Sequence, residues 1–234
     1  MKKVILILFF IAGGLFAQET NPQKILDKVK ERFNVVKDYQ VDLKIKLDVS
    51  FLKMPESKAK VYFKQPDKFK FDSEGFAMLP KEGLNYNPAK FLTDDFTSVY
   101  VKLDDLDGKK VHIIKILPNS DSSEVILTTL YVDAEKYVLN KIETNTKRGG
   151  AIKIDLKYDD GIKYPLPKQV KFNFNMAGMN MSGHMPGKMD DPDDAAKKSK
   201  SKDGISGDVY LYYSNYKINK GIADSFFEKK KERK

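Results

Sequence analysis

Apolar and polar residues alternate without interruption from Tyr39 to Phe51. In a strand, side chains two positions apart point to the same face, so this run presents one apolar and one polar face. The polar positions are occupied by Lys, Asp, Gln and Ser, which suit a face in contact with water. The sequence therefore predicts a long strand that belongs to a sheet covered on one side only.

The same period of two returns along most of the chain. Short alternating runs occupy residues 59–63, 69–71 and 99–103, and the second of them follows Pro66. Further strands are predicted at residues 111–117, 125–132, 137–144, 152–158, 170–176 and 209–217. Turn-forming residues separate them, as in the Gly149–Gly150 pair. Successive strands with short connections favour antiparallel pairing.

One helix is predicted, ahead of the strands. Asn21 and Pro22 open a segment that ends near Asp38 and has apolar residues at helical spacing, namely Ile25, Leu26, Val29, Phe33 and Val36. The fold class is therefore mainly β, with some α: a curved antiparallel sheet or partial barrel of about ten or eleven strands, covered by an N-terminal amphipathic helix.

The first 17 residues have the pattern of an export signal. Lys2 and Lys3 precede a short apolar run at residues 4–11, and small residues lead to Ala17. We expect cleavage near Ala17 and a soluble, periplasmic mature protein with a single domain over residues 18–234. The chain has no cysteine, so neither disulfides nor a lipid anchor on cysteine are expected.

The charge of the chain is basic but dispersed. The formal net charge is +9, with lysines distributed over the alternating strands. Nucleic-acid binding is not expected, because it favours one continuous basic stripe. The one dense basic tract, at residues 229–234, is interpreted as a solvated tail.

Four segments together resemble the LolA-like superfamily of periplasmic lipoprotein and lipid carriers. The opening is KILDKVKERFNVVKDYQVDLKIKL, and the next two predicted strands surround a proline in KVYFKQPDKFKFD. The central segments are LYVDAEKYVLNKIE and KYPLPKQVKF, and the last is YYSNYKINKGIADSFF. The order and spacing of the four segments carry the resemblance, which covers most of the chain after the signal.

The resemblance implies a half-open β-barrel whose concave apolar face is capped by helices and holds acyl chains. It implies a monomeric carrier whose partners are a lipid or lipidated protein and the lipoprotein-handling proteins of the inner and outer membranes. The best-known carriers of this family have Arg directly before the strand-breaking proline, where this chain has Gln65. The fold is therefore implied, but not the particular acyl-chain handover of those carriers.

The predicted binding face follows from the alternation. Its apolar residues are Leu43, Ile45, Leu47, Val49, Val61, Phe63, Phe69, Phe71, Ile154, Leu156, Val170, Phe172, Phe174, Val209 and Leu211. The predicted lid is the inward side of the helix, with Ile25, Val29, Phe33 and Val36. Alternation marks burial alone, so the same residues also fit a closed core under a permanently packed helix.

A methionine-rich segment interrupts the strands. Residues 177–206 contain glycine, proline, a cluster of aspartates and a Lys/Ser run, which predicts a long mobile loop. Thioether and imidazole groups suit Cu(I), so a copper site is a hypothesis for Met176, Met179, Met181, His184, Met185 and Met189. The alternative is a flexible lid that covers variable apolar ligands. No other cofactor is expected.

Catalysis finds no support in the sequence. The chain has two histidines, His112 and His184, and no G-x-S-x-G motif. His112 falls inside a predicted strand, where a structural role is expected. The function predicted is therefore a periplasmic carrier or binding protein for a lipid or for lipoprotein acyl chains. The alternatives are an envelope sensor on the same fold and a copper-binding envelope protein.

Overall fold

The computed structural model describes residues 19–49, 55–73, 92, 95–147, 150–161, 163–176 and 205–228. Its helices and strands in chain order are α1 (Pro22–Asn34), β1 (Asp38–Val49), β2 (Ser57–Lys64), β3 (Lys68–Ser73), β4 (Phe96–Leu106), β5 (Lys109–Pro118), β6 (Val125–Asp133), β7 (Leu139–Thr146), β8 (Ala151–Lys157), β9 (Gln169–Met176), β10 (Ile205–Ile218) and the short 3₁₀ helix η2 (Asp224–Phe227).

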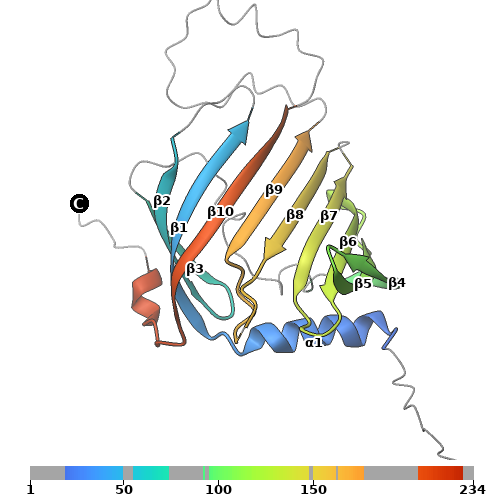
Figure 1. The fold of residues 1–234 in the computed structure, drawn as a ribbon, viewed down its shortest axis with the longest axis horizontal. Helices are drawn as coiled ribbons and strands as arrows, with labels where there is room; N and C mark the ends of the chain where they lie inside the picture. Colours follow the sequence, from blue (N-terminus) through green and yellow to red (C-terminus); the bar gives the residue numbers. More distant parts are fainter. Residues whose placement is uncertain are drawn as a thin grey trace, which may run out of the picture.

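The ten strands form one antiparallel sheet. Their order is β3-β2-β1-β10-β9-β8-β7-β6-β5-β4, so nearly every strand pairs with its neighbour in sequence. The exception is the pairing of β1 with β10, which joins the two ends of the chain. The sheet is curved and not closed into a barrel, and α1 lies along its lower end (Figure 1). The predicted fold class is confirmed.

The helix begins as the sequence predicts and ends earlier. The Asn21 side chain caps α1 by accepting a hydrogen bond from the backbone N–H of Lys24 at 3.2 Å, and Pro22 occupies the first turn. The helix stops at Asn34, not near Asp38. Asp38 is instead the first residue of β1 and is buried, because its carboxylate binds the C-terminal segment described below.

The alternating residues divide the sheet into an inner and an outer face. On β1, Tyr39, Val41, Leu43 and Ile45 are all at most 2% exposed and form part of the inner face, whereas Lys44 and Lys46 are exposed on the outer face. The inner residues of the other strands join the same apolar core as the buried side of α1. The structure therefore confirms that the apolar face of β1 predicted from the alternating pattern is buried.

Two boundaries differ from those that the sequence predicts. The strand expected at residues 137–144 begins at Leu139, because Tyr137 adopts a left-handed backbone conformation with φ 50° that a strand does not accommodate. The loop expected at residues 177–206 ends earlier, since Ile205 and Ser206 already pair with β9. Residues 177–204 lie outside the described part of the chain.

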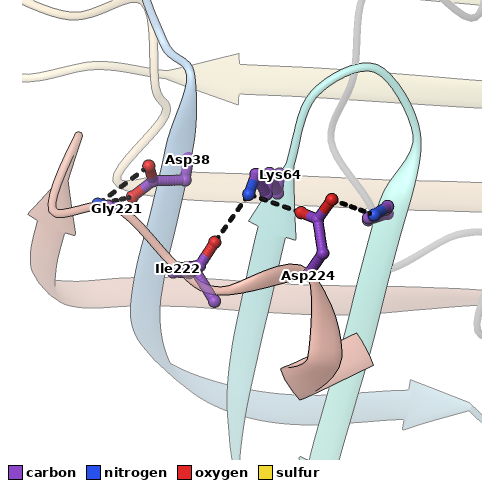
Figure 2. Close-up of polar contacts among 6 residues, drawn as sticks. Asp38, Lys64, Gly221, Ile222 and Asp224 are labelled. Atoms are coloured by element: carbon purple, nitrogen blue, oxygen red, sulfur yellow. Dashed lines mark hydrogen bonds and ion pairs between the residues drawn. The ribbon is translucent and has the colours of Figure 1, made fainter. Parts of the chain in front are cut away.

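The chain after β10 forms a strap, residues 219–228, across the outer face of β1, β2 and β3. The Asp38 carboxylate accepts a hydrogen bond from the backbone N–H of Gly221 at 3.0 Å (Figure 2). It also accepts one from the backbone N–H of Lys220 at 2.9 Å. Further along, Asp224 lies 2.5 Å from the Lys64 ammonium and 2.9 Å from that of Lys68. These two lysines lower the pKa of the exposed Asp224 to about 2.

The strap also fixes the junction between α1 and β1. Asn219 has a left-handed backbone with φ 55°. Its side-chain amide forms hydrogen bonds with two backbone groups of the segment that connects α1 to β1. The amide oxygen accepts from the backbone N–H of Lys37 at 2.7 Å, and the amide nitrogen donates to the carbonyl of Val35 at 2.9 Å. The C-terminal end of α1 is therefore held by groups about 180 residues later in the chain.

Candidate functional site

The inner face of the sheet is the candidate site, and α1 covers part of it. All four predicted lid residues, Ile25, Val29, Phe33 and Val36, are at most 2% exposed. The ring of Phe33 lies 5.9 Å from that of Phe63, between the centroids. Ile25, Val29 and Phe33 lie on α1 and are packed into the core, whereas Val36, predicted to belong to the helix, follows its end at Asn34.

The structure brings the predicted binding residues together on this face. Eight of them are buried: Leu43, Ile45, Val61, Phe63, Leu156, Val170, Val209 and Leu211. Five are partly buried and pack against the core: Leu47, Phe69, Phe71, Ile154 and Phe172. The side chains of the remaining two, Val49 and Phe174, lie outside the described part of the structure.

Two adjacent rows of paired residues cross four strands of this face. The first, here called the sealed row, consists of Ile45, Leu211, Val170 and Leu156, paired in that order across β1, β10, β9 and β8. These side chains are between 0% and 5% exposed. The sealed row lies nearer to the α1 end of the strands.

The second row, here called the open row, lies one step further from α1. It consists of Leu47, Val209, Phe172 and Ile154 on the same four strands. Val209 is 7% exposed, and the other three are only partly buried. Burial thus decreases along the inner face with distance from the helix, although the residues remain apolar.

The inner face becomes more polar on β6 and β7. The hydroxyl groups of Thr128 and Thr144 lie 3.1 Å apart, directly across the two strands. Beyond them, at the start of β6, Ile126 is 53% exposed. The candidate site is therefore an apolar surface on β1, β10, β9 and β8 with a hydroxyl pair at one side. Such a surface can bind an acyl chain by removing apolar area from water.

Gln65, which replaces the Arg of the best-known carriers, lies beside the end of α1. Its backbone N–H donates to the carbonyl of Lys37 at 2.8 Å, and its side-chain amide donates to the carbonyl of Asn34 at 3.4 Å. Gln65 therefore connects the β2–β3 turn to the C-terminal end of the helix. The sequence shows that Gln65 departs from the family pattern, but it does not predict these two hydrogen bonds.

A separate surface hollow of about 450 Å³ lies at the β5–β6 connection. It is lined by Asp95, Pro118 and Asn119 together with Ser120, Ser122 and Ser123. This hollow is open to solvent, and five of its six lining residues have polar side chains. It is not part of the candidate site.

The copper hypothesis remains a prediction. Met179, Met181, His184, Met185 and Met189 lie outside the described residues, as does the side chain of Met176. Within the part of the chain that is described, no three His, Cys, Asp or Glu side chains are grouped to hold a metal ion.

If the methionine-rich segment binds Cu(I), removal of residues 178–203 is expected to abolish that binding and leave the sheet intact, since β9 and β10 pair up to Met176 and Ile205. Competition titration with a Cu(I) chelator, alongside circular dichroism, measures both. The hypothesis fails if the shortened chain binds Cu(I) as the full chain does.

Known proteins resemble the chain in fold. No family model matches the sequence, and no curated protein matches it either. Among solved structures, the chain is similar to a domain described as an outer membrane lipoprotein-sorting protein from Vibrio parahaemolyticus. That similarity has a TM-score of 0.60 and 11% identity, over 88% of this chain and 97% of the other.

Two further structures are similar over nearly the whole chain. A DUF1329 family protein from Desulfovibrio piger has a TM-score of 0.58 and 12% identity, covering 89% of this chain and 98% of its own. A LolA superfamily protein from Nitrosomonas europaea has a TM-score of 0.54 and 13% identity, covering 90% and 99%. The chain therefore has the fold of LolA-superfamily structures, as the four sequence segments predict. No helix among the described residues is long and apolar enough to cross a membrane.

Proposed function

We propose that this protein is a periplasmic carrier or binding protein for a lipid or for the acyl chains of a lipoprotein. The cargo would lie along the open row, with its chain against Leu47, Phe172 and Ile154. In this proposal α1 is the lid, and its withdrawal would extend the binding surface onto the sealed row. No covalent chemistry is involved.

The change in burial between the two rows is the observation that carries this proposal. A protein that needs only a stable core gains from sealing every apolar residue of its inner face. Here the row next to α1 is sealed, and the following row, equally apolar, is left partly accessible. Burying an acyl chain there would contribute about 0.8 kcal/mol of binding free energy per methylene group. The similarity in fold to a domain described as a lipoprotein-sorting protein supports the same proposal.

The location in the proposal rests on the N-terminal pattern of the sequence. Lys2 and Lys3, the apolar run at residues 4–11 and the small residues before Gln18 suit an export signal. The partners proposed on this basis are the proteins that load and receive lipids at the two membranes of the envelope.

The test is native mass spectrometry of the full chain, expressed with its N-terminal segment and purified from the periplasm without detergent, followed by lipid extraction. We expect acyl lipid or lipoprotein at a near-equimolar ratio to the protein. A second measurement adds a fluorescent fatty acid to the delipidated protein. A protein that is isolated empty and does not take up the fatty acid would overturn the proposal.

A further inference from the structure

The hydroxyl pair of Thr128 on β6 and Thr144 on β7 is a polar site within an apolar part of the inner face. Thr128 is 8% exposed, and Thr144 is partly exposed. The nearest residues of this face, across and along the strands, are all apolar: Ile116, Leu130, Ile142 and Ile152. The two hydroxyl groups are therefore the polar groups that a molecule on this part of the face would meet.

The pair has one hydroxyl proton more than its own contact uses. Each threonine hydroxyl carries one proton and can also accept hydrogen bonds. The contact between the two oxygens, at 3.1 Å, uses one of the two protons. Neither hydroxyl has another hydrogen-bond partner within the described structure. The second proton can therefore be donated to an acceptor on a bound molecule.

The accessible part of the inner face leads from the open row to this pair. Ile154, at the end of the open row, is partly buried, but its partner Ile142 on β7 is 1% exposed, and Leu130 beyond it is 0% exposed. The row is therefore closed past Ile154. Two residues earlier on β8, on the same face, Ile152 is again partly exposed, and it pairs with Thr144. A chain along the open row can thus continue over Ile152 to the hydroxyl pair.

The surroundings of the pair favour a neutral acceptor. None of the four flanking residues carries a charge, so an ionised carboxylate placed between them would lose its water without gaining a cation. The carbonyl oxygen of an ester or amide has no charge to desolvate, and it accepts a hydrogen bond from a hydroxyl group. A free fatty acid can still use the open row if its carboxylate stays in water.

We infer that the Thr128–Thr144 pair is the polar end of the cargo site, where one hydroxyl donates to the carbonyl oxygen of an ester-linked or amide-linked acyl chain. This inference rests on the proposed carrier function and narrows its cargo. The cargo is an acylated molecule, bound by the carbonyl group at the head of its chain, while the rest of the chain covers Ile152 and the open row. A free fatty acid binds without using the pair.

The double variant Thr128→Val/Thr144→Val tests the inference in the full chain. Valine has nearly the shape of threonine, and removing both partners of a hydrogen bond together leaves no buried group unpaired, so the fold is expected to persist, as checked by circular dichroism. Two fluorescent probes are titrated, a fatty acid methyl ester and the hydrocarbon in which a methyl group replaces the ester. We expect the affinity for the ester to fall about fivefold, the worth of one neutral hydrogen bond, and that for the hydrocarbon to stay unchanged.

Thr129→Val is the matched control. Thr129 is the next residue on β6, points to the outer face and pairs with Glu143, so the same substitution there is expected to leave both affinities unchanged. The free fatty acid form of the probe distinguishes the two head groups. Its affinity is expected to change little in the double variant, because its carboxylate remains in water.

Three results would overturn the inference. If the double variant binds ester and hydrocarbon with equal changes, or with none, the hydroxyl groups do not recognise the cargo, although uptake of both probes would still support the carrier function. If the free acid loses as much affinity as the ester or more, the pair binds a carboxylate and the cargo is not restricted to esters and amides. If the unaltered protein binds no probe, the carrier function fails, and the inference fails with it.

Discussion

Replacing Phe63 with alanine is expected to lower the free energy of unfolding by about 3–5 kcal/mol. Phe63 is 0% exposed, and its ring contacts those of Phe33 on α1 and Tyr39 on β1. The substitution therefore leaves a cavity between the helix and the sheet that neither can fill without moving. For a domain of this size, the melting temperature is expected to fall by roughly 6–20 °C.

Phe69→Ala is the matched control for Phe63→Ala. Phe69 lies directly opposite Phe63 on β3, an edge strand, and is only partly buried. The same atoms are removed, but less contact is lost, so a smaller decrease in stability is expected. Denaturant unfolding followed by circular dichroism compares the two variants. Equal losses would show that the cluster of Phe33, Tyr39 and Phe63 does not hold the helix more firmly than the edge of the sheet.

The inner face and the fold class could be predicted because they follow from local patterns. Each strand repeats apolar residues with a period of two, and the helix repeats them at a spacing of three or four. These patterns assign Leu43 and Ile45 to the inside of the sheet, and Val29 and Phe33 to the underside of the helix, without knowledge of their partners. The structure confirms all four as buried.

The strap and the pairing of β1 with β10 could not be predicted in this way. Both join segments more than 150 residues apart, and a periodic pattern shows which face is buried but not which strand lies beside it. Asp38 illustrates the problem. In the sequence it reads as the polar end of a helix, whereas in the fold its carboxylate binds Gly221, and nothing near either residue indicates the other.

The division of the candidate site into two rows could not be predicted from the sequence. Ile45 and Leu47 are equivalent in the sequence, since each is an apolar residue on the same face of the same strand. In the fold one is fully buried and the other is only partly buried. The two buried polar side chains His112 and Asn140 were missed for a similar reason. His112 fits the strand pattern, and Asn140 becomes notable only when its buried nitrogen is found without a partner.

Phe172→Glu is expected to weaken uptake of a fluorescent fatty acid at least tenfold. Phe172 lies in the middle of the open row, paired with Val209 on one side and Ile154 on the other. A carboxylate at this position would have to lose water when an acyl chain covers it, and it would repel the carboxylate of the fatty acid. Because Phe172 is only partly buried, the new side chain can remain hydrated in the empty protein, so the fold is expected to persist.

Gln169→Glu separates the effect of position from that of charge. This substitution adds the same negative charge to the same strand, but Gln169 lies on the outer face, paired with Tyr212 and Lys157. Uptake by Gln169→Glu is expected to equal that of the unaltered protein, measured by fluorescence titration of delipidated samples whose circular dichroism spectra agree. If both variants lose uptake equally, long-range charge and not the open row governs binding. If Phe172→Glu retains full uptake, the cargo does not lie along β1, β10, β9 and β8, because a chain on that row cannot avoid the side chain at its centre.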